Sequence, residues 1–213
     1  MPDSAFDQNR YQVRMEWGVA GLARLTATDI VVVVDVLGFS TTMIDAVARG
    51  AECALDAVAD GVSISGAAVA AAAADMGALV LVGALRNATA VAASVYDEQQ
   101  RRAGRTSVAV IAAGELTGRD AATVRFAVED QLGAGAIIDA LGALGIDHTS
   151  PDAAVACESF RALRRATTHL LTASGSGLEL IERGRRDDVI AAAAVDAASV
   201  VPVLRDGAFT PFR

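Results

Sequence analysis

The sequence predicts an α/β protein of three layers (α/β/α), with a mainly parallel sheet between two layers of helices. Short β-branched runs alternate with longer Ala-, Leu- and Arg-rich stretches of helical period along the 213 residues, and this alternation is typical of a parallel α/β sandwich. Apolar residues make up 53% of the chain, enough for a large core. Because no Pro- or Ser-rich linker divides the sequence, we expect one compact unit over residues 1–213.

The clearest strand is the run at 30–36, which reads IVVVVDV and is nearly continuous in apolar residues, as strands buried on both faces are. Residues 11–19 alternate well enough for an edge strand. Further strands are expected at 53–58, 78–82, 107–111 and 200–204, and helices at about 41–49, 62–76, 87–102, 121–143, 151–172 and 186–198. Gly77 is the expected stop of the second helix, and Ser150 with Pro151 the expected start of the fifth.

The composition excludes several classes of function. All 18 basic residues are Arg, and the absence of Lys excludes a Walker-type phosphate loop, Schiff-base catalysis and a pyridoxal-phosphate site. Cys53, Cys157, His148 and His169 are too few and too scattered for a zinc cluster. The formal net charge of −8 argues against nucleic-acid binding, which requires a basic surface.

The sequence also predicts a protein outside the membrane. The most membrane-like stretch, 66–85, contains Asp75, and a charge near the centre of a span costs roughly 2.5–3.5 kcal/mol. Residues 1–7 have neither the basic nor the apolar region of a secretion signal. We therefore expect a cytoplasmic protein, and its Ala-rich helices favour a homodimer.

The first strand-to-helix junction combines a carboxylate with hydroxyl groups. In open α/β sheets, ligands bind beyond the carboxyl ends of the strands. Asp35 ends the strand, and Ser40, Thr41 and Thr42 open the next helix. Such a junction can bind an anion at the helix N-terminus and a divalent cation at the carboxylate. Equally, Ser40 or Thr41 can cap the helix while Asp35 bonds loop amides, and the spacing leaves both interpretations open.

The next two junctions carry further polar residues. Asn87 in the second junction is either an N-cap or a ligand-binding side chain, and Arg86 either contacts an anion or is solvated. In the third, Glu115 and Arg119 are expected at the carboxyl end of the strand.

A helix over 121–143 would place its two acidic residues on different faces. Glu129 lies about 100° and Asp130 about 200° from the buried stripe at 3.6 residues per turn. Arg125 and Glu129 are spaced i,i+4, which predicts a surface ion pair. From the spacing alone, these carboxylates are not expected to share one pocket unless the helix lies across the site.

Three enzyme classes lack their motifs here. No His has an obvious Ser or Cys partner for a hydrolase triad. A haloacid-dehalogenase phosphatase needs a second Asp two residues after the first, but Asp35 is followed by Val36 and Leu37. No G-x-G-x-x-G follows the first strand, so a dinucleotide-binding fold has no support.

Four sequence blocks match the motifs of one family in order. They are VVDVLGFSTT at 33–42, GALRNATAVA at 83–92, AGE with GR and FAVEDQLGAGAI within 113–137, and the Gly- and Asp-containing segments of 173–207. The first three resemble D-V-L-R-A-[ST]-T-T, G-S-F-x-N-A-x-A-V-A and A-G-[TE]-x-G-R … F-x-x-E-D-x-x-x-A-G-A-I of the 2-phosphosulfolactate phosphatase (ComB-like) family.

The resemblance implies a Mg²⁺-dependent phosphatase that hydrolyses 2-phospho-3-sulfolactate, a small anionic phosphomonoester, to sulfolactate and phosphate. It also implies an internal duplication, with halves at about 1–103 and 104–213. Carried over by motif position, Asp35 and Glu129 are the catalytic residues, and Asp35, Glu129 and Asp130 are the metal-binding or water-orienting carboxylates. The substrate-binding residues are then Thr41, Thr42, Asn87 and Arg119.

The sequence departs from the family pattern at several positions. Gly38 replaces the Arg of D-V-L-R, Ser176 replaces a His, and the late Cys corresponds to Ala in 191–194. An Ala-rich segment between Asp60 and Leu79 replaces three family motifs. Removing one preorganised donor costs about 3–4 kcal/mol of transition-state binding. The alternative function is therefore a catalytically lapsed member that binds a small anion or a partner protein.

Overall fold

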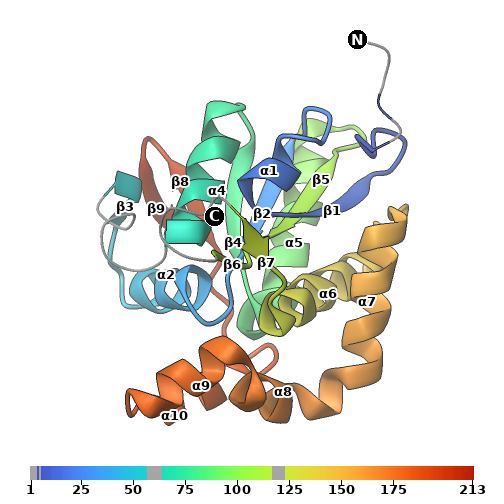
Figure 1. Ribbon diagram of the computed structural model, residues 1–213. Helices are drawn as coiled ribbons and strands as arrows, with labels where there is room; N and C mark the ends of the chain where they lie inside the picture. Colours follow the sequence, from blue (N-terminus) through green and yellow to red (C-terminus); the bar gives the residue numbers. More distant parts are fainter. Residues whose placement is uncertain (1–3, 5, 57–63, 117–122) are drawn as a thin grey trace.

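A seven-stranded sheet forms the centre of the protein (Figure 1). The computed structural model describes residue 4 and residues 6–56, 64–116 and 123–213. The strand order is β1-β5-β2-β4-β8-β9-β3, in which the first four strands are parallel and the last three are joined by antiparallel pairings. These strands are β1 (Val13–Trp17), β2 (Ile30–Val34), β3 (Cys53–Ala54), β4 (Leu79–Gly83), β5 (Val108–Ala112), β8 (Pro202–Arg205) and β9 (Ala208–Pro211). A separate two-stranded hairpin joins β6 (Glu115–Leu116) to β7 (Val124–Arg125).

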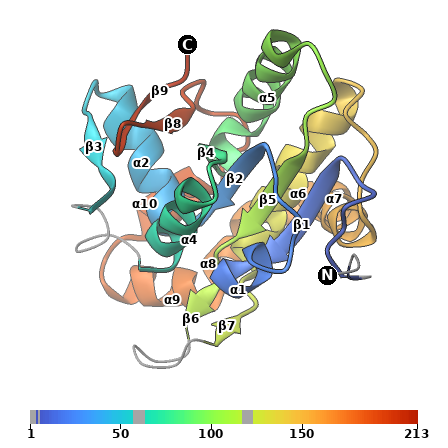
Figure 2. The same cartoon turned by 90° about the horizontal axis from the view of Figure 1, so that it is seen from above.

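Helices cover both faces of the sheet, as the view from above shows (Figure 2). On one face lie α1 (Gly18–Leu22), α2 (Phe39–Ala48) and α4 (Ile64–Asp75), and on the other α5 (Ala88–Arg102), α6 (Val128–Ala143) and α7 (Pro151–Leu163). Short turns of 3₁₀ helix, η1 (Leu85–Asn87) and η2 (Arg164–Ala166), precede α5 and follow α7. The three-layer α/β prediction is confirmed, whereas an internal duplication stays a prediction.

The central strand β2 shows why this sequence forms a sandwich. All five of its residues are buried, since β5 and β4 pair with its two edges and helices cover its two faces. Val32 and Val34 belong to the core beneath α5 and α6, while Val31 and Val33 belong to the core beneath α2 and α4. The uninterrupted apolar run predicted this environment.

Several local predictions are confirmed. β1 pairs with β5 alone among the sheet strands and so lies at the edge. Gly77 follows α4 with φ +77°, the left-handed conformation that glycine adopts readily. The Ser150 side chain accepts a hydrogen bond from the backbone N–H of Ala153, with Pro151 as the first residue of α7.

Three predicted helices differ from the observed ones. The helix expected over 121–143 begins at Val128, because residues 124–125 pair with β6. The one expected over 151–172 is broken at η2 into α7 and α8 (Thr167–Ala173), and the last, α10 (Arg186–Ala192), stops short of 198. The strand expected at 53–58 is observed only as β3, and part of that range lies outside the described residues. The sequence did not predict three of the observed elements, which are α1, α9 (Gly175–Glu182) and β9.

Helices α8, α9 and α10 form an arm across the carboxyl ends of the parallel strands (Figure 1). The far end of the arm is anchored by Asp196. Its carboxylate accepts hydrogen bonds of 2.8 Å from both the backbone N–H and the hydroxyl of Thr89 in the first turn of α5, and its own N–H donates to Leu85 O at 3.1 Å. This long-range contact fixes the arm against the sheet. Within the described residues, no helix has the length and apolarity needed to cross a membrane.

Candidate active site

A cavity of about 580 Å³ opens beneath the arm at the carboxyl ends of β2 and β5. The chain passes from β2 to β4 on one side and later returns to β5 on the other, so this is the switch point at which open α/β sheets bind ligands. The described residues that line it are Asp35, Leu37, Gly38, Thr42, Ser65, Gly114, Glu115, Leu116, Glu129, Asp130, Ser176, Glu179, Leu180, Arg183 and Arg185.

Asp35 lies directly after β2 and is 8% exposed. Its backbone N–H donates to Ser40 Oγ at 2.9 Å, and Ser40 Oγ donates to Val33 O at 3.2 Å, so Ser40 fixes the turn. The carboxylate lies between two glycines: a Cβ at Gly38 would lie 2.4 Å from Asp35 Oδ1, and one at Gly66 2.7 Å from Oδ2. Since contacts below 3.0 Å are essentially never seen, a side chain at position 38 would displace the carboxylate.

Glu129 and Asp130 both reach the cavity, contrary to the expectation from helical spacing. Each is 3% exposed, and both lie in the first turn of α6, where carboxylates are stabilised by the helix dipole. The predicted surface pair of Arg125 with Glu129 is wrong, because Arg125 lies in β7 and pairs with Glu115. With the helix starting at Val128, its end faces the cavity, and the angular separation of the two residues no longer keeps them apart.

Asp130 joins the loops that follow β2 and β5. Its Oδ1 accepts the backbone N–H of Val36 at 2.7 Å, and its Oδ2 accepts that of Gly114 at 2.9 Å. Burial, with the nearby charges of Asp35 and Glu129, raises the pKa of Asp130 well above its ordinary value despite these two hydrogen bonds. The floor of the cavity therefore holds three carboxyl groups, Asp35, Glu129 and Asp130, whose negative charges disfavour one another.

Two further residues belong to the site. Ser176 Oγ, from α9, makes hydrogen-bonding contacts with carboxylate oxygens of both Glu115 and Glu129. Glu115 lies three residues after the end of β5, at the carboxyl end of the strand where the sequence predicted it. Ser176 lies in the first turn of α9, and its approach to the carboxylates depends on the placement of the arm.

The predicted phosphate-binding threonines lie close to the cavity. Thr42 lines it, with its hydroxyl donating to Gly38 O at 2.9 Å. The Thr41 hydroxyl donates to Val36 O at 2.6 Å, and Thr41 is not among the lining residues. Arg119 lies outside the described residues.

Asn87 is not brought into the cavity. The side chain is fully buried, its Oδ1 accepts the N–H of Ala84 at 2.9 Å, and its Nδ2 donates to Val82 O at 3.2 Å and Val200 O at 3.0 Å. Both amide hydrogens are thus engaged by backbone carbonyls, and the residue holds the end of β4 against the approach to β8. Its neighbour Arg86 forms an ion pair of 2.7 Å with Asp45 on α2.

The donor set of the cavity suits Mg²⁺. Among the described residues, no group of three or more His, Cys, Asp or Glu side chains could by itself hold a metal ion. Mg²⁺ requires fewer protein ligands, since it usually keeps several waters and binds one or two carboxylates together with substrate phosphate oxygens. Asp35 and Glu129 provide such carboxylates, and Asp130, whose two oxygens accept backbone N–H groups, lines the same cavity.

Comparison with known proteins identifies a family. The model of the family described as 2-phosphosulpholactate phosphatase matches residues 63–207, more than half of the chain. The matched range contains Asn87, Glu129 and Asp130, while Asp35 and the threonines of the first junction precede it. No curated protein is similar enough to the chain to count as a match.

Proposed function

Because the chain belongs to the 2-phosphosulpholactate phosphatase family, we propose that it is a Mg²⁺-dependent phosphatase of a small phosphomonoester such as 2-phospho-3-sulfolactate, releasing sulfolactate and phosphate. The observation that carries this proposal is the position of Asp35, Glu129 and Asp130 around one cavity at the switch point of the sheet. A cytoplasmic location and a homodimer stay predictions.

The charge of the cavity supports a requirement for a cation. Among the described lining residues five are acidic and two are basic: Asp35, Glu115, Glu129, Asp130 and Glu179 against Arg183 and Arg185. Glu115 pairs with Arg125 and the exposed Glu179 with Arg183, so the repulsion of a phosphomonoester dianion comes chiefly from Asp35, Glu129 and Asp130. When bound, Mg²⁺ supplies the positive charge that offsets this repulsion and stabilises the phosphoryl oxygens during transfer.

The residues of the chain have separable tasks. Asp35 and Glu129 would hold the cation. The carboxylate of Glu129 is also suited to accept a proton from the attacking water, because it lines the cavity and its contact with Ser176 orients it. Asp130 keeps the two loops in register.

Phosphate release from a panel of small phosphomonoesters, with and without Mg²⁺, tests the proposal. Replacing Asp35 with Asn or Glu129 with Gln should lower kcat/KM by about 10²–10³-fold, the range for loss of one preorganised group. Asp75→Asn is the matched control, since Asp75 is exposed at the end of α4, and it should retain full activity. Release that is absent from every ester, or that is equal in wild type and Asp35→Asn, would instead support the catalytically lapsed member.

A further inference from the structure

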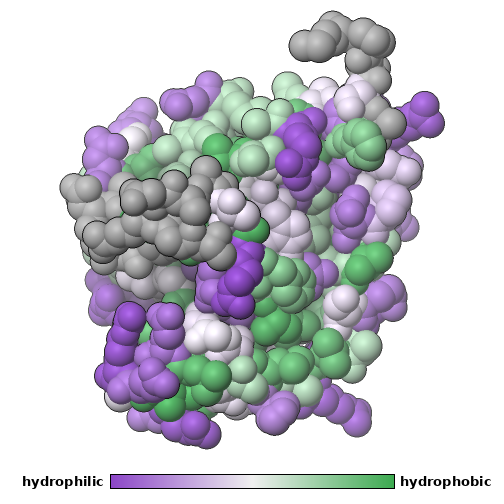
Figure 3. Space-filling view, in the orientation of Figure 1, coloured by the Kyte–Doolittle hydropathy of each residue, from purple (hydrophilic) through white to green (hydrophobic). Residues whose placement is uncertain are grey.

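Two exposed arginines line the mouth of the cavity, above its buried carboxylates. Arg183 and Arg185 both line the cavity, and their side chains are 69% and 58% exposed, compared with 3% for Glu129. In the space-filling view, hydrophilic side chains gather over the ends of α9 and α10 (Figure 3). The same cavity is therefore lined both by the buried carboxylates and by two guanidinium groups.

A closed turn fixes the two arginines relative to each other. Gly184, between them, has φ +77°. The N–H of Arg185 donates to Leu180 O, and that of Gly184 to Ile181 O, both at 2.9 Å. These two bonds form a Schellman motif, so both arginines flank the C-terminal turn of α9 in a defined backbone geometry.

The ion pairs that the two arginines form within the protein are weak enough for an incoming anion to replace them. Arg183 pairs with Glu179 at 3.3 Å, and Arg185 with Asp188 at 2.7 Å, and all four side chains are more than half exposed. Exposed ion pairs within one helix contribute little stability. An anion at the mouth can therefore replace these partners, and guanidinium groups bind planar and multi-oxygen anions through two parallel hydrogen bonds.

We propose that Arg183 and Arg185 form an anion subsite that selects phosphomonoesters carrying a second acidic group, a carboxylate or a sulfonate. The proposal rests on the proposed function, because it takes the phosphoryl group to lie at the acidic floor with its cation. Separated positive and negative ends would orient a substrate along the cavity and disfavour simple alkyl phosphates.

Two readouts test the subsite, one of them independent of turnover. The first is the dissociation constant of 3-sulfolactate, which has no phosphoryl group, measured by calorimetry with Mg²⁺ present. The second is the ratio of kcat/KM for 2-phospholactate to that for isopropyl phosphate, which differ by one carboxylate. In the double variant Arg183→Gln/Arg185→Gln, the dissociation constant should rise about ten-fold and the ratio fall about ten-fold, as expected for lost charge-assisted hydrogen bonds. Lys at both positions should restore part of each.

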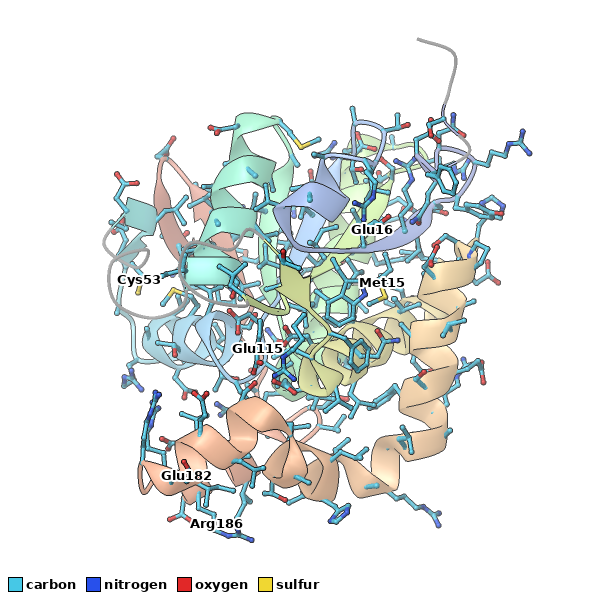
Figure 4. The ribbon with its side chains drawn as sticks, viewed as in Figure 1. Met15, Glu16, Cys53, Glu115, Glu182 and Arg186 are labelled. Carbon is cyan, nitrogen blue, oxygen red and sulfur yellow. The ribbon has the colours of Figure 1, made fainter. Side chains whose placement is uncertain are left out.

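Arg186→Gln is the matched control, because Arg186 is exposed and is not among the described lining residues. Figure 4 shows Arg186 at the lower end of the arm, away from Glu115. An unchanged dissociation constant in the double variant, or an equal rise in Arg186→Gln, would overturn the subsite. Arginine-dependent binding of 3-sulfolactate without hydrolysis of any ester would support the subsite and refute the phosphatase.

Discussion

The packing of α6 against α7 depends on the absence of a side chain at position 135. A Cβ at Gly135 would lie 2.1 Å from Ala156 O and 2.8 Å from Phe160 Cβ. Real Cβ contacts are essentially never shorter than 3.0 Å, so Gly135→Ala would force the helices apart by about 1 Å. Gly142, on the same helix, has no heavy atom within 4 Å of the equivalent position, and is the natural control.

The two substitutions should change stability in opposite directions. Replacing Gly by Ala in a helix stabilises it by up to about 1 kcal/mol, and Gly142→Ala should gain most of this. Overpacking costs about 1–3 kcal/mol or more, and the obstacle at Gly135 is a backbone carbonyl that no rotamer change can move. We expect Gly135→Ala to lower the free energy of unfolding by about 1–3 kcal/mol, and Tm by about 2–4 °C for each kcal/mol.

Urea denaturation followed by circular dichroism measures both differences, provided that the slope with denaturant stays constant. Gly135→Ala should unfold at lower urea than wild type and Gly142→Ala at the same or higher urea. If Gly135→Ala proves as stable as Gly142→Ala, the close contact between α6 and α7 is refuted.

Three further predictions concern acid stability, the buried amide and the cation. Burial acts to raise the pKa of Asp29, but hydrogen bonds from Ser107 and nearby arginines lower it below its ordinary value. This residue therefore adds stability above about pH 4 that is lost as the pH falls. In Asp29→Asn, the free energy of unfolding measured with urea should depend less on pH in the acid range, whereas Asp75→Asn should behave as wild type. Asn87→Ala strands one buried N–H and two carbonyls and should cost about 2–4 kcal/mol; an unchanged unfolding midpoint would contradict this. Burial and neighbouring carboxylates raise the pKa of Asp130, so the stability of the metal-free protein should fall as the pH rises from about 4 through that pKa. Mg²⁺ should therefore raise Tm more at pH 8 than at pH 5. An equal rise in Tm at both pH values would refute the charge argument.

The layered fold follows largely from local sequence pattern. The run at 30–36 predicts a strand buried on both faces, and β2 has that environment. The helix boundaries could not be predicted as well. Residues 123–127 are compatible with a helix, but residues 124–125 form β7 because they pair with β6. That pairing is a tertiary event with no local signal, and it alone moves the start of α6 to the cavity.

The site was predictable where it depends on strand ends. Asp35 could be placed from its strand, and the family motif drew attention to Glu129 and Asp130. The role of Asn87 could not be separated from an N-cap or a ligand contact by spacing, since its carbonyl partner Val200 lies 113 residues away. Arg183 and Arg185 carry no motif, because only the position of the arm brings them to the cavity.

The anchoring of the arm has a consequence for the size of molecules that can reach the carboxylates. One end of the arm continues from α7, and the other is fixed to the start of α5 through Asp196. A closing movement of the whole arm would have to break the hydrogen bonds between Asp196 and Thr89. We expect the opening of the cavity to keep nearly the same width whether or not a ligand is bound. The fixed width then limits the size of the molecules that can enter. We therefore expect a chamber of about 580 Å³ to accept free metabolites in preference to phosphorylated side chains on folded proteins.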